Sequence, residues 1–104
     1  VQLWVNLPAK DKMAPPGYQT LLDGAIPSVA LPDDAGRVRV IAGDYLGAKG
    51  PAKTFTPIDI WDVRLNARRE ARFALPEGHT LLVLVQSGEV RLDGERVAGA
   101  SQLA

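Results

Sequence analysis

Apolar and polar residues alternate along this chain in short runs, the pattern typical of β-strands with one buried face. The clearest runs are residues 1–7, 37–46 and 58–66. The last of them separates its side chains by face, with Trp61, Val63 and Leu65 on one side and Asp62 and Arg64 on the other. An apolar period of 3.6 residues is not sustained over ten residues anywhere. The pattern therefore predicts an all-β chain, with short strands arranged as a sandwich or barrel.

Three weaker segments add to the predicted strands. Residues 26–32 are bracketed by prolines, and Val29 and Leu31 are their candidates for burial. Residues 71–75 give a short strand through alternate apolar positions. Residues 80–86 are almost continuously apolar, as expected of a strand that is covered on both faces.

Turn-forming residues separate these runs. Residues 88–97 hold the strongest local signal, two alternating strands around Asp93-Gly94, a pair that suits a tight hairpin because both turn positions can take positive φ. Residues 8–17 contain three prolines and a glycine and are predicted to be an ordered linker. Residues 18–22 are predicted to form a short strand or one helical turn. Residues 33–36 are predicted to be a turn, and residues 47–57 a loop.

The composition narrows the class of protein. Hydrophobic residues make up 46% of the 104, enough for one small domain with a modest core. Twelve basic and twelve acidic residues give a formal net charge of zero, which argues against a nucleic-acid partner held by phosphate contacts. The longest apolar stretch, residues 81–85, is far too short to cross a bilayer, so no membrane partner is expected. The absence of cysteine excludes disulfides and thiolate metal sites.

The two ends lack the usual features of a domain boundary. Residues 1–7 alternate as a strand with no methionine or turn chemistry before them, and residues 99–104 carry no terminating signal. We therefore expect that the chain is cut from a longer protein. It shows no signal-peptide pattern, which makes the cytoplasm the expected location.

The chain has one histidine, His79, and it directly precedes the apolar run. A histidine beside a β-strand is a common metal ligand in small β-barrel enzymes. The nearest potential co-ligand is Glu77, which alternation would place on the same face. A usable site needs a third and a fourth group, and no spacing in the sequence points to one. A partly exposed structural histidine is the simpler interpretation.

Charged residues elsewhere favour structural roles. Asp59 and Asp62 fall on opposite faces of a strand and make a poor acid–base pair, and Asp33-Asp34 fits turn chemistry. Residues 47–53 are rich in glycine and carry two lysines, but they lack the spacing of a phosphate-binding loop and no helix follows. The arginine-rich residues 66–72 fit a solvated turn, with an anionic partner as the alternative.

Three longer stretches carry a resemblance to a known family: QLWVNLPAKDKMAPPGYQ (2–19), VRVIAGDYLGAKGPAKTFTPIDIWDVRL (38–65) and LPEGHTLLVLVQSGEVRLDG (75–94). They resemble successive segments of the pirin family, in the cupin superfamily. The strings LWVNLPAKDKM and KGPAKTFTPI are long and idiosyncratic, unlike generic patterns. The resemblance covers nearly all of residues 2–94.

This resemblance implies a partial cupin-type barrel. Pirins are bicupins, two β-barrels in tandem, with iron held by three histidines and a glutamate in the N-terminal barrel. Some bacterial members act as quercetin 2,3-dioxygenases, which open a flavonol with O₂, and the human relative is a nuclear transcription cofactor. In the family order, residues 1–7 are the last strand of the N-terminal cupin, 8–27 the interdomain linker and 28–104 an incomplete C-terminal cupin. Iron is then expected in the missing N-terminal cupin, with no cofactor in this chain.

The general cupin pattern, G(X)5HXH(X)3-4E(X)6G, agrees with that expectation. When its final glycine is anchored on Gly88, its ligand positions fall as follows: the glutamate on Leu81, and the histidines on Leu75 and Glu77 or, with the longer spacer, on Ala74 and Pro76. His79 lies between these positions. We therefore expect no catalytic, cofactor-binding or metal-binding residue in the chain.

The resulting prediction is a non-catalytic C-terminal cupin portion of a pirin-like protein whose full-length form is an iron-dependent quercetin 2,3-dioxygenase. Its interior would be filled by side chains in place of a metal, namely Trp61, Val63, Phe73, Leu82, Leu84 and Val90. The alternatives are a protein-interaction module related to the transcription-cofactor role, using residues 47–55 and 66–72, and a small-molecule pocket in the partial barrel.

Two partners are expected. One is the missing N-terminal cupin. The other is a second copy of the chain, because an incomplete barrel exposes strand edges that can pair, with residues 1–7 exchanged between neighbours.

Overall fold

The computed structural model describes residues 2–75, 77–92, 96–99, 102 and 103. The chain divides into two compact units, Val1–Arg72 and Phe73–Ala104. The described residues form short strands and three 3₁₀ turns, so the prediction of an all-β chain is confirmed.

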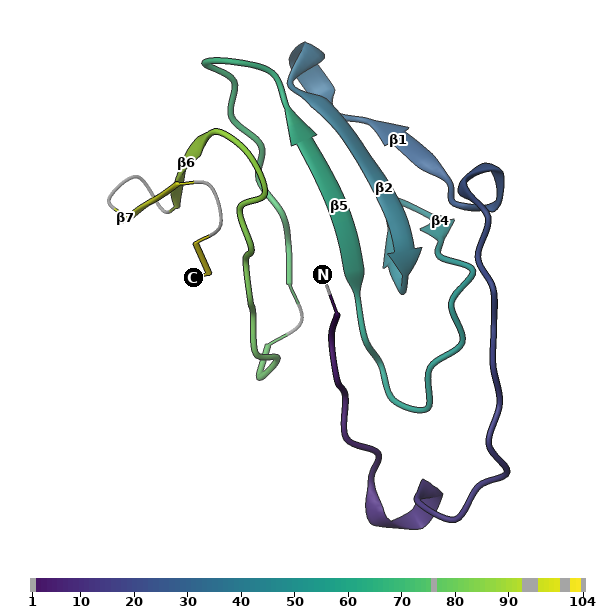
Figure 1. Cartoon of the computed structure of the whole chain (residues 1–104). Helices are drawn as coiled ribbons and strands as arrows, with labels where there is room; N and C mark the ends of the chain where they lie inside the picture. Colours follow the sequence, from purple (N-terminus) through teal and green to yellow (C-terminus); the bar gives the residue numbers. More distant parts are fainter. Residues whose placement is uncertain (1, 76, 93–95, 100–101, 104) are drawn as a thin grey trace. The chain divides into compact units, whose positions relative to one another are not determined.

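A three-stranded antiparallel sheet forms the centre of the first unit (Figure 1). Its strands are β1 (Ser28–Ala30), β2 (Gly36–Ala42) and β5 (Ile60–Leu65), in the order β1-β2-β5. The central strand β2 pairs with both neighbours, and a bulge interrupts its pairing with β5 between Val40 and Ala42. The alternating runs 37–46 and 58–66 therefore do contain strands, as predicted.

One face of this sheet holds the buried core. Val38 and Val40 on β2 are 0% exposed, and Ala42 continues the same row. Trp61 of β5 lies opposite Val40, and its ring packs at 60° against Tyr45 with 5.1 Å between the ring centroids. Since Asp62 and Arg64 lie opposite arginines of β2, the predicted division of β5 into an apolar and a charged face is confirmed.

Strand β2 ends earlier than the predicted run 37–46 because Gly43 adopts φ +80°. The chain then forms a small hairpin of β3 (Asp44–Tyr45) and β4 (Ala48–Lys49). The Asp59 carboxylate accepts a hydrogen bond from the Asp44 amide at 3.1 Å, and a Cβ at Gly43 would overlap that carboxylate. Glycine is therefore required here for both its φ and its size.

The prediction of a strand at residues 1–7 is wrong for residues 2–7, which are extended but not paired with any described strand. Their apolar side chains are largely exposed, with Trp4 at 86%. Alternation marks a strand only where a neighbouring strand supplies hydrogen-bond partners, and the described residues supply none to this segment.

The linker that follows is irregular, as predicted, with two single turns, η1 (Ala9–Asp11) and η2 (Asp23–Ala25). Residues 18–22 form neither the short strand nor the helical turn proposed for them. Gln19 ties the linker to the distant loop: its side-chain amide donates to the Pro51 carbonyl at 2.8 Å and accepts from the Lys53 amide at 2.9 Å.

The connection from β1 to β2 is the turn η3 (Pro32–Asp34), which confirms the turn predicted at the aspartate pair. Asp33 and Asp34 both take positive φ, a conformation that aspartate tolerates better than most residues. The Asn66 side chain donates to the Asp34 carbonyl at 2.7 Å and closes the turn from the end of β5.

In the second unit, β6 (Glu89–Leu92) and β7 (Arg96–Gly99) form an antiparallel hairpin. This confirms the hairpin predicted at residues 88–97, while its Asp93-Gly94 turn lies outside the described residues. Among described residues the only other pairing in this unit is an isolated bridge between Leu84 and Leu103.

The predicted strands at residues 71–75 and 80–86 are not formed, apart from that bridge. A continuous apolar run makes a strand when neighbours cover it on both sides. Among the described residues, the backbone of residues 80–86 pairs only with residues 102 and 103. The run is also not covered by side chains, since Leu82 is 61% exposed.

The prediction that six side chains fill a barrel interior is also wrong. Its six residues are half-buried or exposed rather than enclosed: Trp61, Val63, Phe73, Leu82, Leu84 and Val90. The buried apolar residues of the first unit come from β2 and its connections, namely Leu31, Ala35, Val38, Val40, Ala42 and Tyr45, and those described in the second unit are Val85 and Ala98. In the described part of the chain, no helix has the length and apolar character needed to cross a membrane.

Candidate functional site

The outer face of the β1-β2-β5 sheet gathers charged side chains through strand register. Alternation turns Arg37 and Arg39 of β2 away from the buried valines. Antiparallel pairing then places Arg39 between Ser28 of β1 and Asp62 of β5, and it places Arg37 opposite Arg64. Three arginines from two strands therefore share one face.

Arg39 is the most constrained of the three. Its guanidinium donates to the Asp62 carboxylate at 3.2 Å and also pairs with Asp23, which the turn η2 brings over the sheet. The Arg39 and Asp62 side chains are both about three-quarters buried, so this ion pair is less screened by solvent than a surface pair.

Arg37 and Arg64 have weaker partners. Arg37 donates from Nε to the Ser28 hydroxyl at 2.8 Å and from Nη2 to the Ser28 carbonyl at 3.4 Å, both neutral groups. The Arg64 side chain is 77% exposed, and its Nη2 lies 3.9 Å from an Asp62 oxygen that Arg39 already engages.

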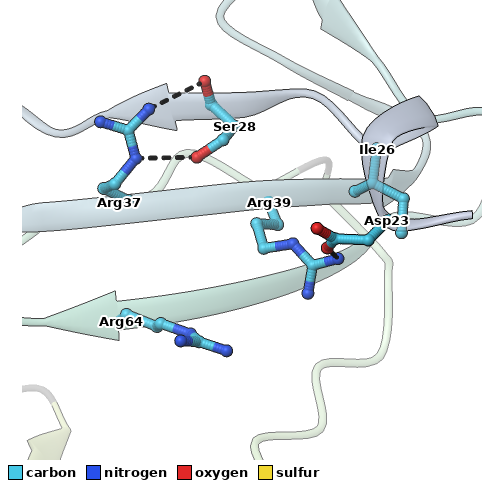
Figure 2. A pocket seen from close by; sticks show the side chains of 6 residues that line it. All are labelled: Asp23, Ile26, Ser28, Arg37, Arg39 and Arg64. Carbon is cyan, nitrogen blue, oxygen red and sulfur yellow. Dashed lines mark hydrogen bonds and ion pairs between the residues drawn. The ribbon is translucent and has the colours of Figure 1, made fainter.

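A shallow pocket of about 380 Å³ lies among these side chains (Figure 2). Its lining residues come from the turn η2 and its flank and from all three strands: Asp23, Ile26, Ser28, Arg37, Arg39 and Arg64. Guanidinium groups and a hydroxyl can hold an anionic group by charge and hydrogen bonds. A nucleophile with an adjacent base is not found among the lining residues, so the arrangement favours binding over catalysis.

His79 and Glu77 are not joined by further potential ligands among the residues that the structure describes. Both side chains are exposed, and Gly78 between them turns with φ +83°. Within the described ranges, no three His, Cys, Asp or Glu side chains come close enough to share a metal ion.

The other carboxylates singled out by sequence have structural partners. Asp59 accepts the hydrogen bond from the Asp44 amide, and Asp62 pairs with Arg39. The two aspartates thus serve different contacts; Asp62 lies on β5, whereas Asp59 directly precedes the strand.

The glycine-rich loop is not a phosphate cradle. Its backbone N–H groups are used by protein oxygens: Gly50 donates to Gly43, Ala52 donates to Ile41, and Lys53 donates to Gln19. The arginine-rich residues 66–72 form an exposed turn, in which Arg68 has positive φ and Arg72 lies 3.8 Å from Glu70.

Sequence reasoning missed the arginine cluster. The alternation of Arg37 and Arg39 with buried valines is a visible signal that they share an outward face. Their proximity to Arg64 and Asp23 depends on register and on the path of the linker, which alternation does not fix.

Comparison with known proteins defines the class. The fold matches the crystal structure of quercetin 2,3-dioxygenase from Acinetobacter baumannii with a TM-score of 0.90 and 40% identity, covering 96% of this chain and 35% of that one. The chain is therefore a segment of the cupin fold. No family model matches it.

Sequence relatives define the family. The chain is 52% identical over its whole length to a Pseudomonas aeruginosa protein named as a putative quercetin 2,3-dioxygenase, of which it covers 36%. It is 37% identical to human pirin over 86% of the chain and 30% of pirin. The chain belongs to the pirin family, as predicted from its long strings, and it spans about a third of the length of these relatives.

Proposed function

We propose that this chain forms the non-catalytic second-cupin portion of a pirin-like protein whose complete form is an iron-dependent quercetin 2,3-dioxygenase. One observation carries the proposal: a chain matched over its full length to such proteins contains a single histidine, and that histidine is exposed. The role of the chain would then be to support the metal-bearing cupin by packing, without touching the substrate.

The donor set of the chain supports this division of roles. Iron in such enzymes is held by several imidazole and carboxylate ligands that converge on one centre. Glu77 and His79 are exposed and, within the described ranges, belong to no group of three potential ligands. The residues present do not fit an iron centre, so we assign them no step that involves the metal.

A segment exchange tests the proposal. The matched part of the Acinetobacter baumannii dioxygenase would be replaced by this chain, because the two share 40% identity and a TM-score of 0.90. We expect the chimera to keep its metal and its flavonol cleavage, while the 104-residue chain alone shows no cleavage. A folded chimera that lost its metal, or flavonol cleavage by the chain alone, would contradict the proposal.

The N-terminal cupin of the family is the partner we propose for the exposed apolar side chains of residues 2–19. Trp4, Met13 and Tyr18 are each more than four-fifths exposed, which is unusual for such large apolar groups gathered in one short segment. In the family order residues 1–7 belong to the first barrel and the linker follows it directly, so the first barrel is the surface we propose to cover these side chains.

An interaction module remains the alternative, because the glycine-rich loop presents Lys49, Lys53 and Phe55 as exposed side chains. Their joint replacement by alanine, in a pull-down against a cell extract, separates the two functions. Loss of a specific partner would favour the module, and unchanged recovery would count against it.

A further inference from the structure

The outer sheet face carries more positive than negative charge around the shallow pocket. Arg37, Arg39 and Arg64 line it, and Asp23 and Asp62 are the acidic groups that contact them. Arg39 engages both carboxylates directly. Among these five residues the charges sum to plus one: Arg37 and Arg64 contribute two positive charges, and Arg39 with its two carboxylates contributes minus one.

Arg37 and Arg64 are two like charges on neighbouring strands. The register puts them directly opposite each other on β2 and β5, where like charges are destabilising. Arg37 is nevertheless held in place by Ser28, through two hydrogen bonds at 2.8 and 3.4 Å. Both side chains line the same open pocket, and an anion placed there would offset their like charges.

We propose that Arg37, Arg64 and the Ser28 hydroxyl bind an oxyanion, the carboxylate or phosphate group of a small molecule. A guanidinium has five N–H donors in a planar fork that matches such groups, and Arg37 uses only part of this set on Ser28. The Ser28 hydroxyl accepts from Arg37 and keeps its own hydrogen to donate. Figure 2 shows these side chains around the open pocket. The site is independent of the metal and flavonol chemistry of the family.

Titration of the 104-residue chain at low ionic strength, followed by NMR shifts of the backbone amides of β2 and β5, tests the site. The probes are inorganic phosphate and succinate, which separate the two possible sources of the oxyanion. Since the site is open, we expect binding with a Kd on the order of 1 mM for the preferred probe. No saturable shift by roughly 50 mM of either probe would overturn the proposal.

Matched variants locate the site. Arg64→Gln removes an exposed guanidinium and should weaken binding by roughly tenfold, the effect of losing one charged contact of about 1.4 kcal/mol. Arg72→Gln removes the same charge from an exposed side chain outside the pocket and should leave binding unchanged. Equal affinity in the Arg64→Gln and unaltered chains would contradict the proposal.

A conservative variant separates specific recognition from general charge. Arg37→Lys keeps the charge but loses the planar fork, so binding should weaken while the urea midpoint of folding stays near that of the unaltered chain. Unchanged affinity in Arg37→Lys would reduce the site to a non-specific positive surface and so overturn the proposal.

Discussion

At the scale of single residues, stability rests on the fully buried valines of β2. Val40 is 0% exposed and faces Trp61 across the sheet. Val40→Ala should lower the free energy of unfolding by about 2 kcal/mol, because it removes buried methyl groups and leaves a cavity. Urea denaturation measures this change.

Val63→Ala provides the matched control. Val63 is paired with Val38 across the same two strands but is 37% exposed, so its truncation should cost clearly less. An equal or larger loss for Val63→Ala would mean that burial on this face is not concentrated at the valines of β2.

The same residues show what local pattern can predict. The faces of β5 follow from alternation alone, since Trp61 and Asp62 must point to opposite sides. The link between Arg39 and Asp23 does not follow, because the two residues are 16 positions apart and the path between them combines two turns with strand β1, which no single periodicity describes. The assignment of His79 to a structural role stays a prediction, which rests on the need of a metal site for several ligands.

At the scale of elements, Gln19 holds the linker against the loop after β4. Its side chain uses both the Pro51 carbonyl and the Lys53 amide, which mimics the pairing of a neighbouring strand. Gln19→Ala should raise the hydrogen-exchange rate of the Lys53 amide several-fold, because that amide loses its acceptor. Exchange monitored by NMR gives the rate directly.

Tyr18→Ala is the control for this contact. Tyr18 adjoins Gln19 in the chain, but its side chain is 95% exposed, so the Lys53 amide should exchange as before. If both substitutions accelerate exchange alike, the linker is held by its backbone and not by the Gln19 side chain.

Strand prediction succeeded or failed at this scale for one reason. The runs that became β2, β5 and the β6-β7 hairpin have partners within the described chain. Residues 2–7 and 80–86 carry equally clear apolar patterns, yet a strand forms only when another strand satisfies its backbone. Sequence pattern identifies the potential strand, while the presence of a partner is a property of the whole fold.

At the scale of the whole molecule, the family could be identified from sequence because long strings such as LWVNLPAKDKM are specific where alternation is generic. The filling of a barrel interior could not be predicted in this way, because the six side chains named for it are half-buried or exposed in the structure. Closing a barrel is a global property that six apolar positions cannot establish.

The exposed apolar groups predict self-association of the 104-residue chain. Trp4, Leu22 and Leu82 are each more than half exposed, and burying such groups between copies is favourable. Light scattering at increasing concentration should show a rising average mass, and Trp4→Ser should reduce it. A clean monomer across the concentration range would refute this prediction.

The central claim is that this pirin-family segment carries no metal centre of its own, and its iron content tests that most directly. The purified chain would be incubated with Fe(II) under anaerobic conditions, desalted and analysed by elemental analysis. We predict iron far below one atom per chain, with no difference between the unaltered chain and His79→Ala. Near-stoichiometric iron that disappears in His79→Ala would contradict the account.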